Sequence, residues 1–182
     1  MSGGHDARAV ANLMLEEAEF SGLLLTNLSL QKLLYFAHGT HLILHKEPLV
    51  SGYFEAWQYG PVHPVVYRSF KEAGSLPIAF RAQAQNPLTG EKSPIEPPAD
   101  RHLPYFLKRV LDSYGLMSAG KLVELSHAKD SPWAFVIEKA ATDVALGLRI
   151  PDNVIQERFR YHMVPINFEH TSGDVIDDTP FT

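Results

Sequence analysis

Three histidines in one expected helix have a spacing that could hold a metal ion. His38, His41 and His45 are spaced i, i+3 and i+7, which places them along one side of a helix. A catalytic zinc ion uses three such ligands and keeps a fourth position for water. The segment supplies no carboxylate before Glu47, and His41 falls among apolar residues, which favours a hydrogen-bonded core histidine. A metal-dependent hydrolase built on these histidines is kept as an alternative function, but no metal or other cofactor is expected.

Other catalytic patterns in the sequence are incomplete. The segment from Gly115 to Leu122 nearly matches the phosphate loop G-x-x-x-x-G-K-[ST], but Leu122 has no hydroxyl for magnesium and a helix is expected before it. The sequence has no cysteine and no G-x-S-x-G elbow. Glu55 lies beside Trp57 without a partner acid, and is interpreted as an acceptor of hydrogen bonds from backbone or tyrosine groups. The protein is therefore not predicted to be an enzyme.

These residues must be positioned by a mainly α fold. Apolar residues repeat with helical spacing in about six segments, whose ends are marked by Gly, Ser and Pro. The expected helices cover residues 7–20, 27–45, 64–73, 103–114, 118–127 and 131–144. Asn153 with Gln156 resembles a capping box before a last helical stretch. The second helix is expected to have one apolar face, made of Leu30, Leu33, Leu34, Ala37, His41 and Leu44.

Aromatic stretches of the sequence predict a minor β element. Stretches rich in Pro and Gly predict where the domain has loops. Residues 53–59 are expected to form a strand or extended turn, and residues 78–82 a short strand. Residues 83–101 are punctuated by Pro and Gly, which predicts an exposed loop such as a hairpin. The prediction is a single compact domain over residues 6–170, with a disordered N-terminus over 1–5 and a flexible acidic tail over 171–182.

Composition excludes several classes of protein. The 182 residues are 45% hydrophobic and 20% charged, which supports a full core. The formal net charge is −5, and Arg101, Lys108 and Arg109 are too sparse for a nucleic-acid interface. The sequence shows no cysteine, no signal-peptide pattern and no apolar run long enough for a bilayer. We therefore expect a cytoplasmic protein without membrane or nucleic-acid partners.

The densest unusual segment runs from Trp57 through Tyr59 to Val62. It contains Gly60-Pro61, which predicts a rigid turn whose aromatic rings fill the core. The same rings could form a recognition surface, because Trp and Tyr supply large contact areas at low entropic cost. The residues alone leave both interpretations open.

Three blocks of the sequence resemble the Panacea antitoxin domain family, which includes SocA-type proteolytic adaptors. The blocks are Leu30–Leu42, Phe54–Tyr67 and Leu122–Trp133, and their order and spacing are similar to those of the family. Gln58 stands where many relatives have an arginine-like residue, and Ser126 where threonine is usual. The three blocks are specific when taken together.

The resemblance implies a protein that works by binding. Members of the family neutralise small toxins through direct contact, and the SocA-type member delivers its toxin to the ClpXP protease. The expected partners are a cognate toxin and the ClpX unfoldase, with sequestration of the toxin alone as the alternative. We expect the partner to contact a surface made of Tyr35, Trp57, Tyr59, Pro61, Val62, His63 and Tyr67.

Overall fold

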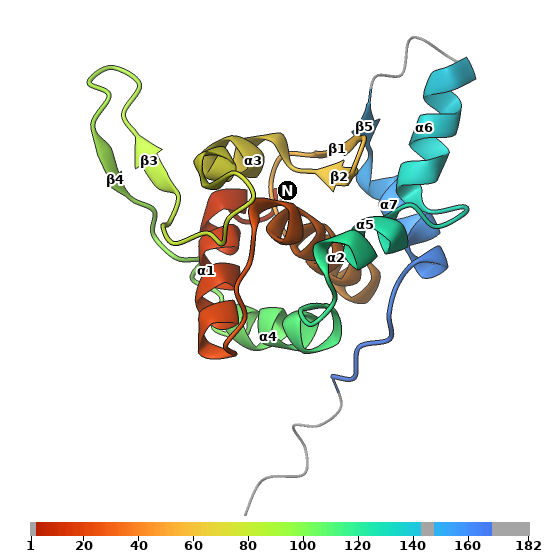
Figure 1. Ribbon diagram of the computed structural model, residues 1–182, viewed down its shortest axis with the longest axis horizontal. Helices are drawn as coiled ribbons and strands as arrows, with labels where there is room; N and C mark the ends of the chain where they lie inside the picture. Colours follow the sequence, from red (N-terminus) through yellow and green to blue (C-terminus); the bar gives the residue numbers. More distant parts are fainter. Residues whose placement is uncertain (1–2, 143–147, 169–182) are drawn as a thin grey trace, which may run out of the picture.

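The fold is mainly α-helical, as the sequence predicts. The computed structural model describes residues 3–142 and 148–168 (Figure 1). These residues form seven α-helices, one more than the approximate number expected, with two 3-10 helices and five short strands. In chain order the elements are α1 (Ala7–Phe20), α2 (Asn27–His45), β1 (Phe54–Trp57), β2 (Gly60–Val62), α3 (Pro64–Phe70), η1 (Lys71–Ala73), β3 (Gln83–Gln85), β4 (Lys92–Pro94), α4 (Leu103–Tyr114), α5 (Ala119–Ser126), α6 (Pro132–Thr142), β5 (Arg149–Ile150), α7 (Asp152–Arg158) and η3 (Phe159–Tyr161).

Helix α2 forms the centre of the domain. It contacts α1, α4, α5 and α7, which surround it in Figure 1. Thirteen of its nineteen residues are buried, because a helix covered on all sides must bury more than one stripe. The expectation of a single apolar face is therefore wrong. Leu44, assigned to that face, is 49% exposed, whereas Lys32 is fully buried.

A three-stranded antiparallel sheet lies beside the helices. Strand β1 is its central strand, with β2 on one side and β5 on the other. Trp57 pairs with Gly60 across the β1–β2 turn, which confirms extended structure near residues 53–59. Helix α3 then begins at Pro64 and continues through η1 to Gly74, as predicted from a proline at the first helical position.

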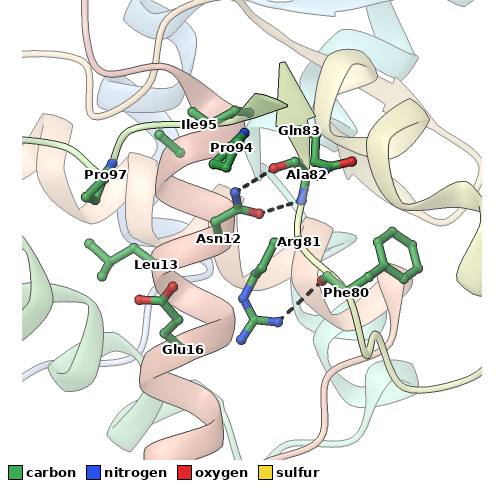
Figure 2. A pocket seen from close by; sticks show the side chains of 11 residues that line it. Asn12, Leu13, Glu16, Phe80, Arg81, Ala82, Gln83, Pro94, Ile95 and Pro97 are labelled. Carbon is green, nitrogen blue, oxygen red and sulfur yellow. Dashed lines mark hydrogen bonds between the residues drawn. The ribbon is translucent and has the colours of Figure 1, made fainter. Parts of the chain in front are cut away.

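The β3–β4 hairpin projects from the helices next to α3, on the left of Figure 1. It lies within residues 83–101, where an exposed loop such as a hairpin is expected. The strand expected over residues 78–82 is wrong, because this segment is held by isolated hydrogen bonds instead of a ladder. The amide of Ile78 donates to the carbonyl of Leu25 at 2.8 Å. Asn12 holds both backbone groups of Ala82, at 2.8 and 2.9 Å (Figure 2).

In the second half of the chain, α5 and α6 begin at the capping residues that the sequence predicts, whereas α7 does not. The Ser118 hydroxyl accepts from the amide of Lys121 at 3.1 Å, and the Ser131 hydroxyl accepts from the amide of Ala134 at 3.2 Å. The expected capping box of Asn153 and Gln156 is wrong. Helix α7 already begins at Asp152, because the extended backbone of Pro151 supplies the N-cap position.

The described N-terminal residues are paired with the body of the domain. The amide of His5 donates to the carbonyl of Leu49 at 2.9 Å, and the His5 carbonyl accepts from the amide of Ser51 at 2.8 Å. The disorder expected for residues 1–5 is therefore wrong for His5. Residues 1–2, the expected helix end near residue 144 and the acidic tail over 171–182 lie outside the described residues. No helix within the described ranges is long and apolar enough to cross a membrane.

Candidate partner-binding groove

A groove of about 480 Å³ lies between the start of α2, the β1–β2 turn and α3. We call it the aromatic groove. Four of the seven residues predicted to bind a partner line it, namely Trp57, Tyr59, Val62 and Tyr67. The structure also brings side chains of α2 to this groove, which the sequence alone could not show. The remaining lining residues are Asn27, Leu28, Gln31, Gln58, Lys71 and Gly74.

The aromatic rings of the groove are accessible to different extents, and two of them pack on each other. Tyr59 is 59% exposed and Tyr67 is 37% exposed, whereas Trp57 is half-buried. The Trp57 and Tyr67 rings meet edge to face, with their centroids 4.9 Å apart. The Trp57 indole N–H donates to Oε2 of Glu55 at 2.7 Å. Glu55 is thus a hydrogen-bond acceptor, as expected, although its side-chain donor is a tryptophan and not a tyrosine.

The tyrosine hydroxyls of the groove have no hydrogen-bond partner within the described part of the chain. Such a ring combines a large apolar face with an unused polar group at its tip. Tyrosine is favoured at protein interfaces for this reason. The groove is therefore suited to an occupant that covers the rings and hydrogen-bonds to the hydroxyls.

Pro61 and His63 do not line the aromatic groove, but their backbone groups form hydrogen bonds that hold its walls together. Both are buried, so neither presents a side chain to a partner. The Pro61 carbonyl accepts a 2.8 Å hydrogen bond from the Lys32 ammonium group. The His63 amide donates to Oε1 of Gln31 at 2.9 Å, and the Gln31 amide group donates to Asn27 at 3.0 Å. These bonds fix the β1–β2 turn and the start of α3 to α2.

The surface position expected for Tyr35 is wrong. Its side chain is fully buried, because α2 is covered on all sides. Its ring packs against Phe36 and Phe54, with centroids 5.4 and 5.5 Å away. Tyr35 therefore belongs to the core and not to a contact surface.

The three sequence blocks meet around a buried lysine. Lys32 belongs to the first block, and burial lowers its pKa to about 7. Gly60, from the second block, has a φ of 95°, and a Cβ there would lie 2.8 Å from Cε of Lys32. Trp133, from the third block, donates its indole N–H to the carbonyl of Trp57 at 2.8 Å. These contacts join the three separated sequence blocks in one junction.

Sequence reasoning missed the polar edge of the groove. Asn27 and Gln31 are four residues apart and therefore lie on the same face of α2. This spacing of two amides within an otherwise apolar segment was the available signal. Lys71 follows α3 at one end of the groove, and its position depends on the turn of η1.

The histidines of α2 have structural roles. His38 is buried, and its Nε2 lies 2.8 Å from Oδ1 of Asp152 on α7. His41 donates from Nδ1 to the carbonyl of Glu47 at 2.8 Å. Within residues 3–142 and 148–168, no group of three or more His, Asp or Glu residues could hold a metal ion. The segment after Gly115 is a helix junction, because the amide of Gly115 donates to the carbonyl of Leu111 at 2.7 Å.

Residues 30–134 match the family model described as Antitoxin SocA-like, Panacea domain, and the chain belongs to this family. It is 46% identical over 175 residues to Antitoxin SocA from Caulobacter vibrioides (strain NA1000 / CB15N), with 96% of this chain and 93% of that protein covered. No solved structure matches the chain. The comparisons confirm the predicted family and the prediction of an antitoxin, not an enzyme, and an antitoxin implies a cognate toxin.

Proposed function

We propose that this antitoxin binds its toxin directly through the aromatic groove. The observation that carries the proposal is the exposure of Tyr59 and Tyr67 in one groove, beside the half-buried ring of Trp57. Exposed aromatic rings on a soluble domain are typical of protein-binding surfaces. Eight of the ten residues that line the groove also lie within residues 30–134, the part of the chain that matches the antitoxin family.

The framework beneath the groove favours tight binding. The Gln31–His63 and Lys32–Pro61 hydrogen bonds hold the turn and α3 in place before a partner arrives. A preorganised surface loses less conformational entropy when it binds. Most of the binding free energy is then expected from the tyrosines, which cluster near the centre of the contact.

The double variant Tyr59→Ala/Tyr67→Ala tests the groove. We expect the dissociation constant for the cognate toxin, measured by isothermal titration calorimetry, to rise by about a hundredfold. Tyr105→Ala is the matched control, because Tyr105 lies on α4 and is 39% exposed, close to the 37% of Tyr67. Unchanged toxin affinity in a folded double variant would contradict the proposal, as would an equal loss in Tyr105→Ala.

We extend the proposal to delivery of the toxin to the ClpXP protease. This part rests on the resemblance to SocA-type proteolytic adaptors. The test measures the half-life of purified toxin with ClpXP, in the presence and absence of the antitoxin. An adaptor shortens this half-life, and the groove variant abolishes the effect. A toxin that is bound but degraded no faster would establish sequestration instead. Deletion of residues 171–182 then determines whether the acidic tail takes part in delivery.

A further inference from the structure

A second groove lies on the other flank of α3. It has a volume of about 350 Å³ and runs between α3 and the β3–β4 hairpin. Four cationic residues line it, Arg8, Arg68, Arg81 and Lys92, against the single carboxylate of Glu72. We call it the basic groove. This local excess of positive charge contrasts with the net charge of −5 of the whole chain.

Two of the four cations are already neutralised and two are not. Arg8 pairs with Asp6 and Arg81 pairs with Glu19, each at 2.8 Å. The side chains of Arg68 and Lys92 have no ion pair or hydrogen bond to any described residue. The two unpaired cations come from α3 and β4, on opposite walls of the groove. They are therefore available to an anionic ligand that lies between the walls.

The groove also presents apolar surface between its charges. Val65 is 40% exposed and Phe80 is 38% exposed, and both line it. The Phe80 ring packs on Phe70 with centroids 5.8 Å apart, which holds it in place. The wall that carries Phe80 is fixed further by the two hydrogen bonds between Asn12 and Ala82 (Figure 2). A ligand for this groove needs both carboxylates and apolar side chains.

Helix α3 separates the basic groove from the aromatic groove. Tyr67 and Lys71 line the aromatic groove, whereas Val65, Arg68 and Glu72 line the basic groove. Residues three and four positions apart share one face of a helix, so the two sets occupy neighbouring faces. Residues 65–72 thus form a ridge between two surfaces of different chemistry.

We propose that the basic groove binds an acidic peptide segment of a protein partner, with its carboxylates on Arg68 and Lys92 and an apolar side chain on Phe80. Charge complementarity of this kind orients a partner and speeds its association. A nucleic acid fits less well, because its binding requires many phosphate contacts and the groove offers two unpaired cations beside Glu72. The proposal is independent of toxin binding in the aromatic groove.

A titration with a defined probe tests the proposal. The probe is a fluorescein-labelled ten-residue peptide of glutamate and leucine, followed by fluorescence anisotropy at low salt. We expect saturable binding to the wild type, and at least about tenfold weaker binding to Arg68→Glu/Lys92→Glu. The matched control Arg101→Glu/Lys129→Glu makes the same change in net charge at exposed positions outside the groove. It is expected to change the affinity by less than about twofold.

Three results would overturn the proposal. The first is the absence of saturable binding by the wild-type protein. The second is an equal loss of affinity in both charge-reversal variants, which would show a response to net charge alone. The third is tighter binding of a ten-nucleotide single-stranded DNA that also depends on Arg68 and Lys92. The Tyr59→Ala/Tyr67→Ala variant is expected to retain the peptide, which separates this site from the aromatic groove.

Discussion

The hydroxyl of Tyr35 donates a 2.8 Å hydrogen bond to Nε2 of His162, across 127 positions of the chain. The direction of this bond follows from the other ring nitrogen. Nδ1 of His162 lies 2.8 Å from the carbonyl of Phe159, which can only accept, so Nδ1 carries the proton. His162 is therefore neutral, and burial lowers its pKa to about 4.

We expect the free energy of unfolding to fall between pH 6.5 and pH 4 because of His162. The unfolded chain binds a proton near pH 6.5, the ordinary pKa of histidine, but folded His162 resists protonation until about pH 4. The neutral histidine gives full stability above pH 6.5, and about 3 kcal/mol is lost by pH 4. Urea titrations across this range are expected to show a smaller pH dependence in His162→Phe than in the wild type.

Tyr35→Phe separates the hydrogen bond from the burial. This variant removes the donor but leaves His162 buried, so it is expected to lose about 1 kcal/mol at pH 7. It should retain the acid-induced loss of stability, since burial is the cause of the low pKa. An equal pH dependence in wild type and His162→Phe would contradict the assignment.

Lys32 is expected to make stability rise between pH 7 and pH 10.5. Its folded pKa of about 7 lies below the ordinary value of 10.5, so the unfolded chain binds more protons in this window. Lys32→Met removes the buried amine and its pH dependence. We compare the free energy of unfolding of Lys32→Met with that of the wild type at each pH. The difference, variant minus wild type, should be about 2 kcal/mol larger at pH 7 than at pH 9. Denaturant titrations at the two pH values measure the difference, and a pH-independent difference would exclude a low lysine pKa.

Gly60→Ala should destabilise the junction of the three sequence blocks. The φ of 95° strains any side chain, and a Cβ would also lie 2.8 Å from Cε of Lys32. We expect a loss of about 2–3 kcal/mol, seen as a lower thermal midpoint. Gly22→Ala is the control, because its φ is 71° but no atom lies within 4 Å of the added Cβ. It should lose only the free energy of unfolding that the backbone strain costs, about 1 kcal/mol. Equal losses in both variants would show that the close approach of the Gly60→Ala Cβ to Lys32 has no cost.

Local sequence signals predicted most of the elements. Pro64 marked the start of α3, Gly74 ended η1, and Ser118 and Ser131 capped α5 and α6. Each of these effects acts within a few residues of the chain. The start and end of a helix can therefore be predicted from the residue types at those positions, without knowledge of the rest of the fold.

Contacts between distant segments could not be predicted in this way. The spacing of His38 and His41 shows that they share a side of α2, but not that Asp152 of α7 meets His38. Similarly, the pattern around Tyr35 cannot show that α1, α4, α5 and α7 surround α2. Four of the residues expected to contact a partner line the aromatic groove, and these four lie close together in the sequence. Asn27 and Gln31 were missed because α2 supplies them from another segment.

Asn12→Ala should loosen the base of the β3–β4 hairpin. The Asn12 side chain holds the amide and carbonyl of Ala82 at 2.8 and 2.9 Å, and all these groups are buried. Loss of the side chain leaves two buried backbone groups without partners, which is expected to cost about 2 kcal/mol of unfolding free energy. Amide exchange at Ala82 should accelerate more than exchange in α2, because the opening is local.

Asn86→Ala is the matched control for this effect. Asn86 also bonds to the backbone, since its Oδ1 accepts from the amide of Leu88 at 2.9 Å, but it lies at the exposed hairpin turn. It is expected to leave exchange at Ala82 unchanged. Because Phe80 and Arg81 directly precede Ala82, Asn12→Ala should also weaken binding of the acidic peptide to the basic groove, whereas Asn86→Ala should not. Unchanged exchange at Ala82 in Asn12→Ala would show that the hairpin base is held by other contacts.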